Sequence, residues 1–442
     1  MKRIEDAVNR NRELILEAER HIWKNPETGY REYKTTRYLG EKFEELGYEL
    51  TYADGITGFY TVYDTGKPGP TILVMGELDS LVVPNHPESD PETGYVHSCG
   101  HNAQCAGLLG VAAALKEDGV CDNLCGKVKL CAVPAEELIE IEYRTELKKQ
   151  GKIKYYGGKG EFLHRGYFDD CDIALLVHTS VQAFVRCGHV GCIAKEVSYK
   201  GVASHAGGSP WNGINAVYAA TQGLSAANAI RETFKEDDII RFHPIITEGG
   251  AVVNAIPDLV KLESFVRGKT FDAMLEANKK INQALCGGAL SIGANIEIKD
   301  IPGYAPLVNE PGLIEVLKEA AEAIIPEENF FVDPTFSSGS TDMGDLSCVM
   351  PTIHPYAGGA TGKAHGDDYY IADPDRACVK SAKMQLAMLK LLLENDGARA
   401  KEIIANFEPQ FKSKEEYFEY IDKINSEGDR IIYKDDVAEI RI

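Results

Sequence analysis

Three apolar runs constrain the fold of this chain more than any other feature, because each ends directly before polar residues of the kinds that bind metals. The runs lie at residues 71–75, 127–133 and 173–177. Strands that are almost wholly apolar are typical of sheets covered on both faces, as in α/β proteins. Open α/β sheets bind ligands where their strands end. The pattern therefore predicts an α/β fold with a polar site at one edge of its sheet.

The polar residues that follow the three runs are carboxylates and an imidazole. Glu77 and Asp79 follow the first run, Glu136 and Glu137 the second, and His178 ends the third. One of two adjacent glutamates can bind a metal while the other serves as a general base toward water. A capping aspartate and a surface glutamate pair explain the first two motifs when each is taken alone. The repetition at three strand ends favours a metal site.

A cysteine and a histidine separated by one glycine add two further candidate ligands. Cys99 and His101 stand just before the apolar stretch 108–115, which predicts a buried helix. Glycine tolerates the sharp backbone path that would aim both side chains at one point. The alternative is a loop with a buried cysteine and a helix-capping histidine. His365, in a glycine-rich loop, is another candidate.

Composition indicates a protein of two or three domains and excludes some partners. The chain has 442 residues and a formal net charge of −21, which opposes binding to nucleic acid or to an anionic membrane. Its eleven cysteines are odd in number and show no disulfide framework. We find no signal peptide and no apolar run of the roughly 18 residues that span a bilayer. A cytoplasmic, reducing location is expected.

A change of pattern near residue 190 predicts an inserted domain. Residues 191–303 alternate strands and helices in the order βαββαβ, which is that of a ferredoxin-like domain. The first domain is then discontinuous, over 1–190 and 304–442. The inserted part carries His205 and Asn254, which also fit ordinary loop and turn positions. The charged segment 138–157 and the tail from about 397 have no assigned role.

Five ordered blocks give the chain a family resemblance. They are Glu77-Leu-Asp79, His97-Ser-Cys99-Gly-His101-Asn102, Pro134-Ala-Glu136-Glu137, Ser204-His205-Ala206 with Asn254-Ala-Ile-Pro257-Asp258, and Ser340-Thr-Asp342 followed by His365. This pattern resembles the aminoacylase and carboxypeptidase-type co-catalytic metallopeptidases, in their amidohydrolase branch. That branch includes N-acyl-amino-acid amidohydrolases and p-aminobenzoyl-glutamate hydrolases. The resemblance implies a catalytic domain with a central mixed sheet flanked by helices, and an inserted α+β lid or dimerisation domain.

The resemblance also implies a metal centre with two divalent ions per subunit. By this likeness Cys99 would bridge the two ions. His101, Glu137, His178 and His365 would be the other ligands. Zinc suits a thiolate with imidazoles and carboxylates best, with manganese and cobalt as alternatives.

Further roles follow from the same resemblance. Glu136 would be the general base and acid. Asp79 would orient a ligand histidine by accepting its other N–H. His205 would act in trans on the oxyanion in a partner subunit, which implies at least a homodimer. Asn254 and Arg267 would contact the substrate carboxylate.

Two positions depart from the commonest form of the branch. Asn102 stands where an aspartate is usual, and Gln104 replaces a histidine. Asn102 is closer to the p-aminobenzoyl-glutamate hydrolase and dipeptidase-like subgroup.

We therefore expect a metallo-amidohydrolase that cleaves the C–N amide bond of a small N-acyl amino acid, a dipeptide or a p-aminobenzoyl-glutamate-like substrate. Two alternatives stay open. One is an inactive binding homologue of the same fold, and the other is a hydrolase of another C–N bond, such as that of a carbamoyl group.

Overall fold

The computed structural model describes residues 1–435 and 437–442 and divides the chain into two compact units. The first unit comprises Met1–Gly188, Leu307–Thr335 and Thr341–Lys414. The second comprises His189–Pro306, Phe336–Ser340 and Glu415–Ile442.

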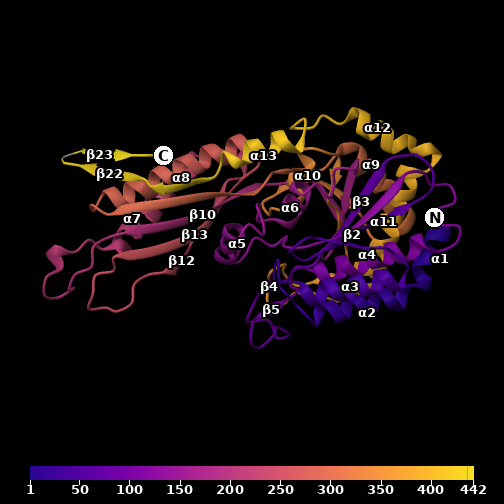
Figure 1. Cartoon of the computed structure of the whole chain (residues 1–442), viewed down its shortest axis with the longest axis horizontal. Helices are drawn as coiled ribbons and strands as arrows, with labels where there is room; N and C mark the ends of the chain where they lie inside the picture. Colours follow the sequence, from indigo (N-terminus) through magenta and orange to yellow (C-terminus); the bar gives the residue numbers. More distant parts are fainter. Residues whose placement is uncertain (436) are drawn as a thin grey trace. The chain divides into compact units, whose positions relative to one another are not determined.

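A six-stranded mixed sheet forms the centre of the first unit, as predicted (Figure 1). Its strands in spatial order are β1 (Thr51–Tyr52), β2 (Phe59–Asp64), β6 (Lys127–Val133), β3 (Thr71–Glu77), β7 (Ile173–Leu176) and β17 (Thr352–Ile353). The four strands from β6 to β17 run parallel, whereas β2 is antiparallel to β6. Every residue of β3 is buried, which explains its unbroken apolar sequence.

Helices bury the apolar surface of this sheet. They are α1 (Lys2–Arg10), α2 (Arg12–Trp23), α3 (Tyr33–Glu45), α4 (His101–Leu115), α9 (Pro311–Ile324) and α11 (Ser381–Leu393). Helix α4 packs against β3, α2 and α11, and all of its residues are buried. Gly100 precedes α4 with a φ of 87°, and a Cβ there would lie 2.3 Å from the hydroxyl oxygen of Tyr369. Only glycine meets both conditions at this helix start.

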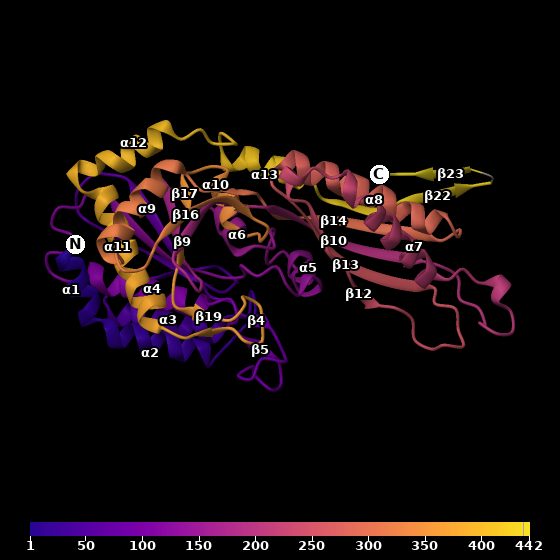
Figure 2. The same cartoon turned by 180° about the vertical axis from the view of Figure 1, so that it is seen from behind.

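The first unit also contains a smaller sheet, visible from behind in Figure 2. Its strands in order are β15 (Leu307–Val308), β9 (Phe184–His189), β18 (Tyr356–Ala357) and β8 (His178–Thr179), and β16 (Phe331–Ser337) pairs with β9. Two short helices, α5 (Ile141–Lys149) and α6 (Gly158–His164), follow β6. The segment 138–157 thus contains a helix.

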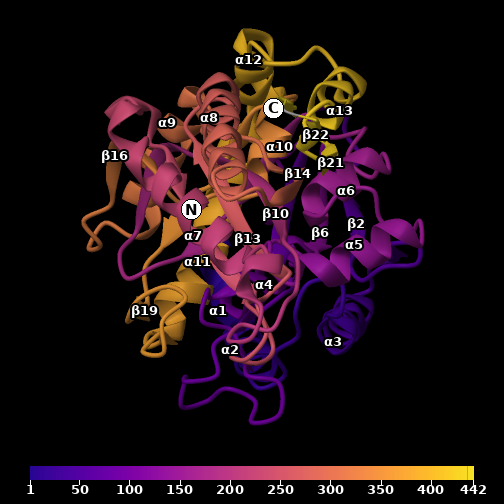
Figure 3. The same cartoon turned by 90° about the vertical axis from the view of Figure 1, so that its left-hand side faces the viewer.

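The second unit is an antiparallel sheet with two helices, α7 (Ala216–Ala229) and α8 (Phe271–Leu290), that pack against each other and against the sheet (Figure 3). The strands in order are β11 (Arg241–Phe242), β13 (Leu259–Gly268), β10 (Gly191–Lys200), β14 (Asn295–Tyr304) and β21 (Ser426–Asp429), and β12 (Ile245–Glu248) also pairs with β13. The chain order of β10, α7, β11, β12, β13, α8 and β14 matches the predicted ferredoxin-like pattern, with the second predicted strand split into two short ones.

The unit bounds differ from the predicted domain bounds by two or three residues near 189 and 305, and residues 336–340 and 415–442 also lie in the other unit. Residues 415–442, which we assigned to the first domain, belong to the second unit, because β21 forms antiparallel hydrogen bonds with β14. Strands β22 (Ile431–Lys434) and β23 (Val437–Ile440) pair antiparallel with each other in a separate two-stranded sheet. A charged tail carries little apolar periodicity, so its strand pairing has no clear sequence signal.

No helix among residues 1–435 and 437–442 is both long enough and apolar enough to cross a membrane.

Candidate metal centre

The predicted ligands come together where the strands of the first unit end. Glu77 is the last residue of β3, and Glu136 and Glu137 follow β6. His178 follows β7, and His101 is the first residue of α4. Side chains that are far apart in the sequence therefore meet at one edge of the sheet, as expected for this topology.

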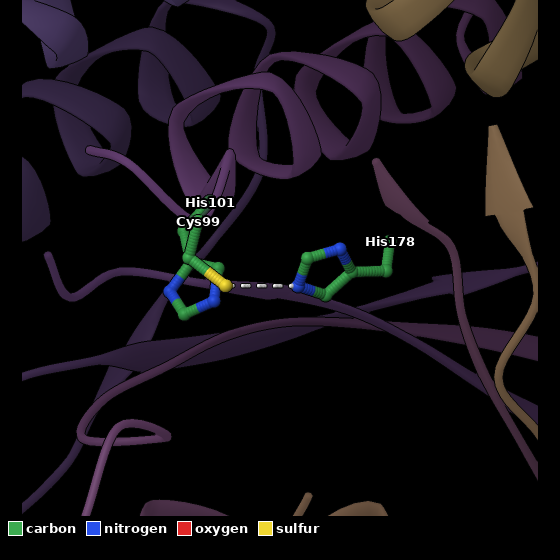
Figure 4. A group of neighbouring side chains, drawn as sticks. All are labelled: Cys99, His101 and His178. Carbon is green, nitrogen blue, oxygen red and sulfur yellow. Dashed lines mark hydrogen bonds between the residues drawn. The ribbon is translucent and has the colours of Figure 1, made fainter. Parts of the chain in front are cut away.

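Cys99 belongs to two clusters of potential ligand atoms. It lies with His101 and His178 in one cluster and with Glu137 and His365 in the other, and the ligand atoms of each cluster are within 4.8 Å of one another. Its Sγ is 3.4 Å from Nε2 of His178, and Figure 4 shows the sulfur pointing toward that ring. In the second cluster, Nε2 of His365 lies 3.2 Å from Oε1 of Glu137. One thiolate shared by two sets of donors is the arrangement that a bridging ligand requires.

The electrostatics of this site favour an ionised thiol. Burial and the negative charge of Glu137 oppose ionisation of Cys99, but the fields of His178, His101 and His365 outweigh them and lower its pKa to about 6. Burial also opposes ionisation of Glu137, yet His365 lowers its pKa to about 2. The effect is mutual, because the negative charge of Glu137 raises the pKa of His365 to about 11. Thiolate and carboxylate are the ligand forms that metals need, and each histidine would give up its extra proton when an ion binds.

Two buried atoms at this site fit a divalent ion. Nε2 of His101 and Oε1 of Glu137 are buried and make no well-aligned hydrogen bond among the described residues, although Oε2 of Glu77 and Nε2 of His365, respectively, lie 3.2 Å from them. Buried polar atoms are rarely left unsatisfied. The other ring nitrogen of His101 lies 2.9 Å from the backbone oxygen of Asp79 and 3.2 Å from its Oδ1. The donor set of thiolate, imidazole and carboxylate thus fits two divalent ions, which Nε2 of His101 would help to hold.

Asp79 links the two halves of the site. Its Oδ1 faces His101, while its Oδ2 accepts a hydrogen bond of 2.8 Å from the backbone N–H of Glu137. Burial would raise the pKa of Asp79, but the hydrogen bond and charge of His101 lower it on balance. An ionised Asp79 can hold the ring of His101 and the backbone of Glu137 at once.

Glu136 lies beside the clusters. Its Oε2 is 3.9 Å from Nε2 of His101, and with Glu77 and His101 it forms a third group of potential ligand atoms. Burial raises the pKa of Glu136 well above its ordinary value, and the charges of Glu77 and Glu137 raise it further. A carboxyl group that holds a proton this strongly suits a general acid.

The other three predicted site residues lie in the second unit. The Nδ1 atom of His205 accepts hydrogen bonds from the backbone N–H groups of Gly207 and Gly208, at 3.2 and 2.9 Å. Its exposed ring must then carry its proton on Nε2 when neutral. Asn254 is also exposed, and its backbone oxygen accepts a bond of 3.0 Å from the N–H of Ala206.

Arg267 lies on strand β13, whereas His205 and Asn254 lie in loops. Its Nη1 donates to Oγ of Ser340 at 3.2 Å. Its Nε is buried without a hydrogen-bond partner among the described residues.

A family model for peptidases of family M20/M25/M40 matches residues 73–391. The chain belongs to this family. It is an M20 metallo-hydrolase that acts on C–N bonds.

Three similar proteins illustrate the range of this family. A Xaa-Arg dipeptidase from Mus musculus is 28% identical over 374 residues, covering 80% of this chain and 79% of its own. An indole-3-acetyl-aspartic acid hydrolase from Enterobacter agglomerans is 25% identical over 397 residues, covering 77% of this chain and 86% of its own. A dinuclear metal-binding M20 peptidase from Bacillus subtilis superposes with a TM-score of 0.62 at 20% identity, covering 86% of this chain and 97% of its own. The last comparison supports the fold alone.

The two departures from the commonest M20 motif have structural partners. Nδ2 of Asn102 donates to Oε1 of buried Glu19 on α2, at 2.8 Å. Nε2 of Gln104 donates to Oε2 of Glu77, also at 2.8 Å. Both side chains therefore connect the start of α4 to neighbouring elements.

Sequence reasoning missed one charged residue at this M20 site. Lys159 is fully buried on α6, where its ammonium group lies 2.5 Å from Oε1 of Glu77 and 2.5 Å from Oδ1 of Asp342. Its place in Gly-Gly-Lys-Gly, just before apolar Phe162 and Leu163, is the only sequence signal we find. This local sequence is equally typical of a lysine in a loop.

Proposed function

We propose that this M20 enzyme hydrolyses the amide bond of a small substrate that carries an amino acid with a free carboxylate. N-acyl amino acids, dipeptides and p-aminobenzoyl-glutamate-like compounds form this class. The observation that carries the proposal is the position of Cys99 in two ligand clusters with Glu136 beside them. The dipeptidase and the indole-3-acetyl-aspartic acid hydrolase support the class, since both names describe an amide to an amino acid.

Cys99, His101, Glu137, His178 and His365 would hold two divalent ions. When bound, the ions supply Lewis-acid chemistry, which polarises the amide carbonyl and makes water more acidic. Zinc is the expected metal, because a thiolate with imidazole ligands suits it best, and manganese and cobalt are the alternatives. The two ligand clusters that share Cys99 support the number of ions.

Glu136 would move the proton of the reaction. It removes a proton from water as the oxygen adds to the amide carbon, and it then gives that proton to the leaving nitrogen as the C–N bond breaks. The products are a carboxylic acid and an amine, so one water is consumed for each bond cleaved. The high proton affinity of Glu136 supports the second step.

His205, Asn254 and Arg267 would bind the substrate. His205 presents an Nε2–H donor to solvent, which suits stabilisation of an oxyanion in a partner subunit. Arg267 has an uncommitted buried N–H and a planar group that can grip a carboxylate with two hydrogen bonds. The role of His205 in a partner subunit requires at least a homodimer.

The eleven cysteines are all free in the structure, which supports a reducing, cytoplasmic location.

A substrate panel tests this proposal. Protein loaded with zinc, manganese or cobalt is given N-acetyl amino acids, dipeptides, p-aminobenzoyl-glutamate and N-carbamoyl amino acids, and amine release is measured. We expect hydrolysis of at least one of the first three classes. Activity on the carbamoyl compounds alone would assign the other C–N bond, and metal binding without any hydrolysis would indicate an inactive homologue.

A further inference from the structure

The turn that carries the two glutamates has a strained backbone. Ala135, directly before Glu136, has a φ of 57°, in the left-handed region that residues with a Cβ adopt at a cost of about 1–3 kcal/mol. Such a conformation persists only when its surroundings hold it. The turn also has to aim two neighbouring carboxylates at different partners, since Glu136 faces His101 and Glu137 faces His365.

Arg144 contacts this turn at both ends. It lies on α5, within the segment 138–157, and only 1% of its surface is exposed. Its Nη1 donates to the backbone oxygen of Ala135 at 3.3 Å, and its Nη2 donates to that of Glu137. Nη1 also donates to the backbone oxygen of Tyr156 at 2.7 Å, which ties the guanidinium to the end of the same segment. A planar guanidinium can bridge these acceptors in fixed geometry.

Two carboxylates hold the N–H groups of the same turn. Oε1 of buried Glu32 accepts from the N–H of Ala135, and Oδ2 of Asp79 accepts from the N–H of Glu137, both at 2.8 Å. The amide and carbonyl groups on either side of Glu136 are therefore all bound by buried side chains.

The space beside the guanidinium is kept free by a glycine. A Cβ on Gly29 would lie 2.5 Å from Nη2 of Arg144 and 2.9 Å from Cα of Ala135. The loop before α3 is thus shaped around this arginine and this turn.

We propose that Arg144 is a positioning residue for the hydrolysis, which fixes the Ala135–Glu137 turn so that Glu136 reaches the reacting atoms while Glu137 stays in its ligand position. This inference rests on the proposed roles of the two glutamates. It assigns to the segment 138–157 a function in catalysis.

Replacement of Arg144 tests the inference through kcat and metal affinity. We expect Arg144→Met to lower kcat by about 100-fold with little change in KM, because a displacement of about 1 Å costs that much. Metal affinity, measured by chelator competition, should fall by about 10-fold through Glu137. Arg144→Lys keeps the charge but loses the fork, so it should recover only part of both quantities.

Gly29→Ala provides a second variant, which crowds both the guanidinium and the Ala135 backbone while Arg144 is retained. It should lower kcat, as Arg144→Met does. If Arg144→Met does not fold, Gly29→Ala and Arg144→Lys together test the positioning role. Arg165→Met is the matched control. Arg165 donates to the backbone oxygens of Asp54 and Lys152 at 2.5 and 2.6 Å and to Oε1 of Glu161 at 2.7 Å. It thus holds the same segment at Lys152, but none of these acceptors belongs to the Ala135–Glu137 turn, so its loss should leave kcat and metal affinity unchanged.

Wild-type kcat and metal affinity in folded Arg144→Met, or in both Arg144→Lys and Gly29→Ala, would overturn the inference. Glu136→Gln separates this outcome from failure of the proposed function. An inactive Glu136→Gln beside a fully active Arg144→Met refutes the positioning role alone. A fully active Glu136→Gln refutes the assignment of the general base itself.

Discussion

The ammonium group of Lys159 lies 2.5 Å from a carboxylate oxygen of Glu77, and both side chains are fully buried. The same ammonium lies 2.5 Å from Asp342, so one cation faces two buried anions. Burial opposes the charge of Glu77, but Lys159 together with His101 and His178 outweighs it and lowers the Glu77 pKa to about 2. For Asp342, burial prevails and raises the pKa to about 6. The charges behind the candidate metal centre thus depend on one lysine.

Removal of that lysine should destabilise the protein strongly. Lys159→Met leaves two buried carboxylates without their cation, and we expect the free energy of unfolding to fall by about 3–5 kcal/mol. Urea denaturation of the metal-free protein measures it. Lys380 pairs with Glu327 and Glu328 nearer the surface, so Lys380→Met should cost less than about 1 kcal/mol. Equal losses in the two variants would contradict this account.

Glu32 should make stability depend on pH. Burial and then the charge of Asp79 raise its pKa from 4.5 to about 8, so the folded state binds its proton more tightly than the unfolded state does. The stability it contributes is fully present below about pH 4.5 and is lost as the pH rises through about 8. We therefore compare the free energy of unfolding of Glu32→Gln with that of wild type by urea denaturation. When the pH is raised from 5.5 to 9, the difference should shift in favour of the variant by at least about 1 kcal/mol.

Glu328 is the control for that pH effect. Burial opposes its charge, but hydrogen bonds from Arg376 and Lys380 lower its pKa on balance. Its contribution to stability is lost only as the pH falls through its lowered pKa, so Glu328→Gln should show no relative gain between pH 5.5 and pH 9. If the difference in free energy of unfolding between Glu32→Gln and wild type does not change over the same pH range, the pKa of Glu32 is not raised.

The proposed role of His205 in a partner subunit predicts complementation between two inactive variants. When His205→Ala and Glu136→Gln chains are co-expressed as a statistical mixture of dimers, half of the dimers are mixed. Each mixed dimer holds one complete site. We expect about a quarter of the wild-type activity. If the activity of the mixture does not exceed the summed activities of the two separate variants, His205 does not act in a partner subunit. It would then act in its own subunit or have no part in catalysis.

Arg267 should matter only for substrates with a free carboxylate. A charged hydrogen bond contributes about 1.5–3 kcal/mol, so Arg267→Met should lower kcat/KM by roughly 10- to 100-fold for such a substrate. The matching carboxamide serves as the control and should be nearly unaffected. Parallel losses on both compounds would show that Arg267 supports the fold through Ser340 rather than the substrate.

The features that could be predicted from the sequence are those with a strong periodic or motif signal. The apolar strand β3 and the mixed sheet around it are confirmed, as are the family and its C–N hydrolase chemistry. Glu77 ends β3 and His178 follows β7, and the parallel pairing of these strands brings both to the edge where Cys99 precedes α4. The individual roles of these side chains stay predictions.

Features that depend on tertiary contacts could not be predicted. Lys159 and Arg144 look like surface cations in sequence, and only the packing of α5 and α6 shows that both are buried. The pairing of β21 with β14 is likewise a contact between distant segments with little local pattern. Charged residues inside a fold take their roles from partners that the local sequence does not reveal.

Glu136→Gln tests the central claim most directly, because it removes the proton carrier and keeps the shape of the side chain. Metal content and hydrolysis of the best substrate from the panel are measured on the same sample. The account predicts about two metal ions per chain, as in the wild type, with hydrolysis abolished. Full activity in this variant with its metal retained would contradict it.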